Sequence, residues 1–146
     1  MSNTIVWATD GSEHAERALS VAKTLMRDDR AAIIVLHVVQ RFATRTGLAV
    51  HADEELVEDR LERAVEELSS EGVHATLRIV NHVGPQPAHE IADVAREAGA
   101  DLIVVGSRGH GPLAGLLLGS VATRLLHIAP CAVVVVPAAA ASPATS

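Results

Sequence analysis

The feature that most constrains this chain is a regular alternation of short apolar runs with amphipathic stretches from one end to the other. Continuous apolar runs are typical of strands covered on both faces, and apolar residues every three to four positions are typical of helices. The alternation predicts an α/β fold, a parallel sheet with helices on both faces. The expected strands are 4–8, 32–39, 75–80, 102–105 and 132–136, and the expected helices are 12–27, 53–71, 88–98 and 120–128.

The strands differ in a way that predicts their order. The third expected strand partly alternates and carries Arg78, which suits an edge of the sheet. A flavodoxin-like order 3-2-1-4-5 places it there and makes the first and fourth strands neighbours. The crossovers on either side of the first strand then leave in opposite directions. A crevice is therefore expected between the carboxyl ends of the first and fourth strands.

The last strand, 132–136, is the other expected edge. It has high β-propensity and no charge, and such an edge invites pairing with another chain. We therefore expect a homodimer through this strand, with coverage by the chain's own tail as the alternative.

Length and composition indicate one domain. A chain of 146 residues can bury roughly 68–70% of its unfolded surface. We expect a single domain over 1–137 and a flexible tail over 138–146, whose low-complexity sequence has no apolar pattern. Residues 40–52 are expected to form a mobile loop. The second helix, which with its flanks holds nine of the eighteen acidic residues, is expected to present a solvated acidic face.

Charge and cysteine content exclude several classes of function. The net charge is −6 and no basic run occurs, which argues against a nucleic-acid-binding surface. The single Cys131 excludes an internal disulfide and is typical of a reducing compartment. No apolar run approaches the roughly 18 residues of a membrane span. The expected location is therefore the cytoplasm, with no membrane partner.

A glycine-rich segment follows the fourth expected strand. Gly106–Ser120 contains five glycines and faces Thr9–Ser12 across the expected crevice. Gly106 and Gly109 lack Cβ atoms, so their backbone N–H groups can turn toward an anion. Gly119 and Ser120 then open the last helix, with Ser120 as N-cap or first-turn residue, and a helix start offers free N–H donors and a positive dipole end. This pattern predicts a phosphate cradle; glycines that serve only tight packing are the alternative.

The segment does not match the two commonest phosphate-binding motifs. Lys23 is the only lysine and no Gly-Lys-Ser/Thr occurs, which excludes a Walker A loop. A dinucleotide fingerprint belongs after the first strand, where only Gly11 is found. Neutralisation of a phosphate would fall to Arg108, to Arg124, to a bound Mg²⁺ and to the backbone.

The spacing Gly106-x2-Gly109-x9-Gly119-Ser120 resembles the ATP-binding signature of the universal stress protein family. Further segments resemble the family in order along nearly the whole chain. They are 5–12, 36–38, 84–91, 101–106 and 130–137.

The resemblance implies a nucleotide site. In ATP-binding members the base lies against the end of the second strand, here Val38, and beside the turn that contains Asp10. The remaining residues that it implies as ATP-binding are Ala8, Thr9, Gly106, Ser107, Arg108, Gly109, Gly119, Ser120 and Val121. It also implies a dimer through the last strand. Independently of the resemblance, we expect Mg²⁺ only through the bound nucleotide, with Asp10 as a candidate ligand. Arg108 and Ala122 depart from residues common in the family.

The sequence contains no convincing catalytic constellation. Eight histidines show no spacing typical of a metal site, and no serine has a His–Asp relay. We expect a nucleotide-dependent stress-response or regulatory module rather than an enzyme, with slow ATP hydrolysis left open. The alternatives are a flavin-binding or nucleotidyl-transferring enzyme of the same fold, and an interaction protein that binds no nucleotide.

Overall fold

The computed structural model describes residues 3–11, 13–50, 53–83, 87–107 and 118–137. Strands and helices alternate as expected, with one additional strand. In chain order they are β1 (Thr4–Thr9), α1 (Glu13–Thr24), β2 (Ala32–Thr44), β3 (Gly47–Ala49), α2 (Glu54–Ser70), β4 (His74–Val83), α3 (Ala88–Ala98), β5 (Leu102–Gly106), α4 (Ser120–Ile128) and β6 (Ala132–Val136).

Five strands run parallel in the order β4-β2-β1-β5-β6, which is the order expected for the five apolar runs. The prediction of a five-stranded sheet is wrong in its count. The sheet has six strands because β3 pairs with the end of β2 in antiparallel orientation. β4 and β6 lie at the two edges of the parallel set, as predicted.

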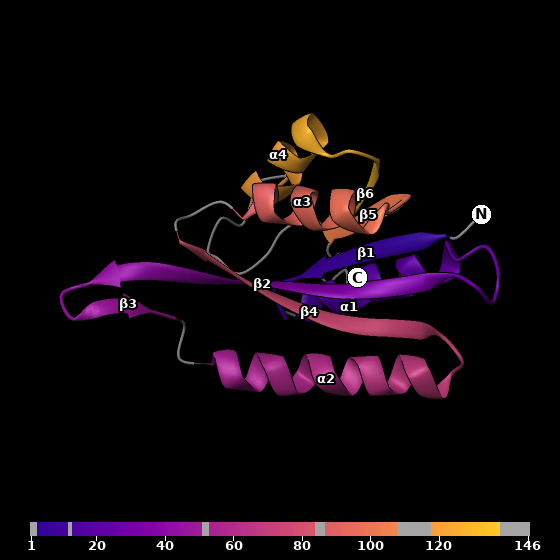
Figure 1. Cartoon of the computed structure of the whole chain (residues 1–146), viewed down its shortest axis with the longest axis horizontal. Coiled ribbons are helices and arrows are strands. Elements are labelled where there is room, and N and C mark those ends of the chain that lie inside the picture. Colours follow the sequence, from indigo (N-terminus) through magenta and orange to yellow (C-terminus); the bar gives the residue numbers. More distant parts are fainter. Residues whose placement is uncertain (1–2, 12, 51–52, 84–86, 108–117, 138–146) are drawn as a thin grey trace, which may run out of the picture.

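The additional strand also corrects the prediction of a mobile loop over residues 40–52. β2 continues to Thr44, and β2 and β3 form a hairpin that projects beyond the neighbouring strands (Figure 1). Gly47 has φ +131°, and the Thr44 hydroxyl donates to the Gly47 carbonyl at 2.8 Å, which closes the turn. Residues 51 and 52, like the tail 138–146, lie outside the described residues.

Two helical layers cover the sheet (Figure 1). α1 and α2 pack on one face against Ile5 and Trp7, whereas α3 and α4 pack on the other face against Val6 and Ala8. β1 is thus buried from both sides, as its continuous apolar sequence predicted. Trp7, the only tryptophan, is 2% exposed.

The acidic second helix has the surface predicted for it. Three residues of α2, Val57, Leu61 and Leu68, are buried against the sheet, and the intervening acidic positions are mostly exposed. No described helix combines the length and the apolar character needed to cross a membrane.

Candidate functional site

The register of the sheet brings two turns together at its carboxyl edge. β1 and β5 are parallel neighbours, with Ala8 opposite Val105. The chain therefore leaves β1 through Thr9–Gly11 directly beside the point where it leaves β5 through Gly106 and Ser107. The expected juxtaposition of these segments is confirmed, and it falls where open α/β sheets bind ligands.

The turn after β1 is compact and depends on glycine. Thr9 is buried, and its hydroxyl oxygen accepts a hydrogen bond from the Gly11 amide at 3.0 Å. Gly11 has φ +79°, a conformation that side chains with a Cβ rarely adopt. A Cβ at Gly11 would also lie 2.5 Å from Cγ1 of Val57 on α2. Glycine is thus required both by the backbone and by the adjacent helix.

Side chains from β2 and α2 hold the same turn. His37, 4% exposed and in register with Thr9, donates from Nδ1 to the Thr9 carbonyl at 3.0 Å. Its other ring nitrogen, Nε2, bonds to Oε1 of Glu54 in the first turn of α2. Six residues further along α2, Arg60 donates from Nη1 to the Gly11 carbonyl at 2.8 Å.

The hydrogen bonds of His37 define where a proton must reside. A carbonyl oxygen only accepts, so Nδ1 carries a hydrogen. The Nε2–Glu54 contact then needs one further proton, on the imidazole or on the carboxyl group.

The segment after β5 is joined to the start of α4 by backbone bonds. The Ser107 amide donates to the Val136 carbonyl at 2.8 Å, and the Gly119 amide donates to the Ser107 carbonyl at 2.5 Å. Gly119 is the N-cap residue, with φ −70° and ψ 164°, and Ser120 is the first helical residue. No side chain caps this helix start among the described residues. The first amides of α4 lack intrahelical acceptors and carry the positive end of the helix dipole.

The structure places most of the predicted residues at this edge. Ala8, Thr9 and Asp10 lie at the end of β1, Gly106 and Ser107 at the end of β5, and Gly119, Ser120 and Val121 at the start of α4. Val38 follows His37 on β2, so its side chain lies on the opposite face of the sheet from that of His37.

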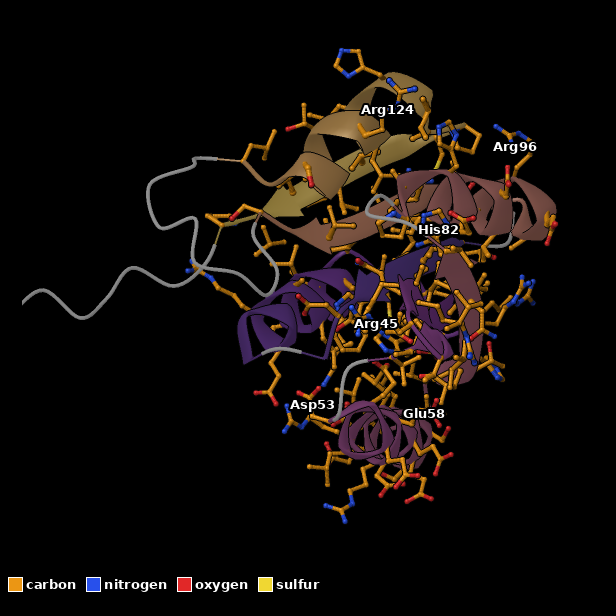
Figure 2. All side chains as sticks on the ribbon, turned by 90° about the vertical axis from the view of Figure 1, so that its left-hand side faces the viewer. Arg45, Asp53, Glu58, His82, Arg96 and Arg124 are labelled. Atoms are coloured by element: carbon orange, nitrogen blue, oxygen red, sulfur yellow. The ribbon has the colours of Figure 1, made fainter. Side chains whose placement is uncertain are left out.

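Two predicted residues, Arg108 and Gly109, fall outside the described residues. Arg124 lies exposed on the outer side of α4 (Figure 2). The part of the chain that the structure describes contains no group of three His, Cys, Asp or Glu side chains arranged to hold a metal ion.

Sequence reasoning missed Glu54 and Arg60, and it placed His37 within the expected strand 32–39 without assigning it a contact. His37 is buried as expected, but β2 continues seven residues beyond it to Thr44. Glu54 and Arg60 are separated from their partners by 17 and 49 positions, respectively. No local sequence signal links residues so far apart.

The order of the strands defines the class of protein: a doubly wound α/β domain in which the strand order reverses at β1, so that the turns after β1 and β5 lie side by side. The family model of the universal stress protein family matches residues 1–137, and the chain belongs to this family. A relative in Bacillus subtilis, universal stress protein YxiE, is 34% identical over 93% of this chain and 99% of its own length.

Solved structures agree with this assignment. The structure of MJ0577 is similar with a TM-score of 0.74 and 29% identity, covering 92% of this chain and 95% of that one. MJ0577 is a universal stress protein of Methanocaldococcus jannaschii. A universal stress protein from Archaeoglobus fulgidus in complex with dAMP has a TM-score of 0.60 and 25% identity, covering 92% and 97% of the two chains. One in complex with cAMP has a TM-score of 0.59 and 25% identity, covering 92% and 96%.

Proposed function

We propose that this chain binds an adenine nucleotide, with ATP as the expected ligand, at the carboxyl edge of the sheet. The observation that carries the proposal is the register of β1 against β5, which sets the Thr9–Gly11 turn beside Gly106 and Ser107. The bond from Gly119 to Ser107 adds the start of α4 to the same place. The dAMP and cAMP complexes of the two relatives support a nucleotide as the ligand.

The donor set fits a phosphate group. The first amides of α4 point out of the helix start, and their positive dipole end favours an anion. Gly106, Ser107 and Gly109 line the rest of the proposed cradle, with Arg108 supplying positive charge. Ser120 and Val121 contribute their amides from the first turn of α4.

The base and ribose would occupy the other side of the edge. Ala8, Thr9 and Asp10 lie at the end of β1, and Val38 follows on the adjacent strand. Mg²⁺, when present, would be held through the phosphates, with Asp10 as the candidate protein ligand. Its chemistry there is charge neutralisation of the phosphates.

In this proposal, nucleotide occupancy serves a stress-response or regulatory module in the cytoplasm rather than a dedicated enzyme. The described side chains at the edge include the His37–Glu54 pair, but His37 bonds to a backbone carbonyl and the two side chains bond to each other. Slow ATP hydrolysis is not assigned to any residue. Among the described strands β6 pairs only with β5, and this edge supports a homodimer as the assembled form.

The experiment is a titration of the purified full chain with ATP, dAMP and cAMP, with and without Mg²⁺, by isothermal calorimetry. Saturable heat with at least one nucleotide is expected. Denaturing the protein and identifying any released nucleotide checks whether a ligand copurifies.

A matched pair of variants locates the site. Gly119→Val places a branched side chain at the helix start and should abolish binding while the protein stays folded. Ser69→Val adds similar bulk at an exposed position in the last turn of α2 and should bind normally. Absence of binding by the unmodified protein would favour the alternative, an interaction protein without nucleotide.

A further inference from the structure

The three peptide groups around Asp10 are all fixed by hydrogen bonds. The Thr9 carbonyl accepts from His37, the Gly11 amide donates to the Thr9 hydroxyl, and the Gly11 carbonyl accepts from Arg60. These groups belong to the peptide planes before, within and after the Asp10–Gly11 step. The direction in which the Asp10 side chain leaves the backbone is therefore set by its neighbours.

Two of these three bonds come from outside the turn, and both lead to α2. Arg60 lies on α2, and His37 is held by Glu54 at the start of that helix. Val57, 6% exposed and between these two positions, fills the space that the missing Cβ of Gly11 leaves open. The first two turns of α2 thus contact the turn directly through the Arg60 hydrogen bond and the Val57 side chain, and indirectly through the bond between Glu54 and His37.

The rest of α2 is attached differently. Near its other end, Lys23 of α1 forms an ion pair with Glu71 at 2.6 Å, and both side chains are 40% exposed or more. Figure 1 shows that α2 runs beneath the sheet, from the side where the parallel strands end to the side where they begin. Figure 2 views α2 along its axis, with Asp53 just before its first turn and Glu58 on a near turn. The start of α2 therefore contacts the turn after β1, whereas the end of α2 contacts α1 far from that turn.

We propose that His37 and Arg60 are positioning residues that hold the Thr9–Gly11 turn in its ligand-receiving conformation, with Glu54 orienting His37. This role rests on the proposed nucleotide site. Since coupling between two sites is reciprocal, a bound nucleotide that needs this turn must also stabilise the first two turns of α2. Nucleotide binding would thereby also stabilise the acidic face of α2, which does not contact the nucleotide site.

The test of Arg60 compares the nucleotide affinity of four full-length proteins by calorimetry. Arg60→Ala should raise Kd about tenfold, because the Gly11 carbonyl loses its hydrogen bond and the turn is no longer held in one conformation. Arg60→Lys keeps a donor without the guanidinium geometry and should recover part of the affinity, to about threefold of the unmodified Kd. Arg63→Ala, an exposed arginine three residues along the same helix, should stay within about twofold.

Two substitutions of His37 separate its two bonds. His37→Asn keeps a donor in the place of Nδ1, and His37→Gln keeps a polar group in the place of Nε2. We expect His37→Asn to bind within about threefold of the unmodified protein and His37→Gln to bind about tenfold more weakly, because only the former still satisfies the Thr9 carbonyl.

Amide hydrogen exchange gives a readout that does not need a ligand. Exchange at Gly11 should become faster in Arg60→Ala and stay unchanged in Arg63→Ala. In the unmodified protein, added nucleotide should slow exchange in the first two turns of α2 more than near Glu71.

The outcomes separate the two proposals. Lack of nucleotide binding by the unmodified protein rejects the proposed function and this role with it. Normal binding by the unmodified protein, together with unchanged affinity in Arg60→Ala and His37→Gln, rejects the positioning role alone. Equal loss of affinity in Arg60→Ala and Arg63→Ala assigns the effect to the charge of the helix and likewise rejects it.

Discussion

The turn after β1 and the segment after β5 lie side by side at one edge of the sheet, yet they are held by different means. The first is fixed by side chains from β2 and α2 and by the absence of a Cβ at Gly11. The described part of the second is joined by backbone bonds from Ser107 to Val136 and from Gly119 to Ser107. Stability should therefore be sensitive to side-chain changes at the first and tolerant of them at the second.

The largest expected effect is that of Gly11→Ala. The left-handed backbone and the overlap with Val57 together should lower the free energy of unfolding by about 2–4 kcal/mol. In a Val57→Ala background the overlap is gone, and the same substitution should cost only about 1–2 kcal/mol. Urea unfolding of the four proteins measures both values. Equal costs in the two backgrounds would show that Val57 does not confine the turn.

A smaller loss is expected for Thr9→Val. Valine has the shape of threonine but leaves the Gly11 amide without its acceptor, at a cost of about 1–2 kcal/mol. Thr9→Ser keeps the hydroxyl and is the control. Chemical denaturation of both variants provides the measurement, and a loss in Thr9→Ser as large as that in Thr9→Val would assign the effect to packing instead.

Gly119→Val tests whether the segment after β5 tolerates a larger side chain without loss of stability. Gly119 has an extended backbone that any residue adopts, so the free energy of unfolding should change by no more than about 1 kcal/mol. Its effect on nucleotide affinity, by contrast, should be larger than that of any single change in the turn after β1. A stability loss as great as that of Gly11→Ala would remove the distinction between the two segments.

The smallest effect on stability is expected at Cys131. This residue immediately precedes β6, at the end of the sheet where the parallel strands begin. Burial, and then the charge of Asp101, raise the pKa of its thiol above the ordinary value. The folded protein therefore favours the neutral thiol. The resulting stabilisation is complete below the pH at which the unfolded thiol ionises and is lost as the pH rises through the folded pKa.

Alkylation by iodoacetamide measures this shift. The rate should rise at a higher pH in the native protein than in urea, since the thiolate is the reacting form. Nucleotide affinity should not change after alkylation, because Cys131 lies away from both turns. Loss of nucleotide affinity after alkylation would contradict this prediction and would show that Cys131 is coupled to the turns after β1 and β5.

The sequence allowed the parallel order to be predicted because its signals are local. Continuous apolar runs marked the strands, and Arg78 marked the edge. The hairpin was missed because residues 40–49, of mixed polarity, were interpreted as a loop, although Phe42, Thr44 and Gly47 suit a strand and a turn. Polarity alone does not separate an exposed hairpin from a loop.

The candidate site was predicted in part for a similar reason. Glycines at the ends of strands and just before helices indicate turns, so Gly11, Gly106 and Gly119 could be placed before the structure was known. The contacts of Glu54 and Arg60 could not, because they depend on where α2 lies against the sheet. Arg60 could equally pair with one of the exposed carboxylates of its own helix, and only the packing of α2 against the sheet brings it to the Gly11 carbonyl.

The position of Trp7 has a practical consequence. This sole tryptophan is buried two residues before Thr9 and packs in the same cluster as Val57 and Leu61 of α2. Its fluorescence comes from one known place, so the emission spectrum needs no deconvolution and no attached dye. Any rearrangement of α2 relative to β1 should change the quantum yield or the emission maximum. Trp7 is thus an intrinsic fluorescence probe next to the turn after β1, whose movement it can report.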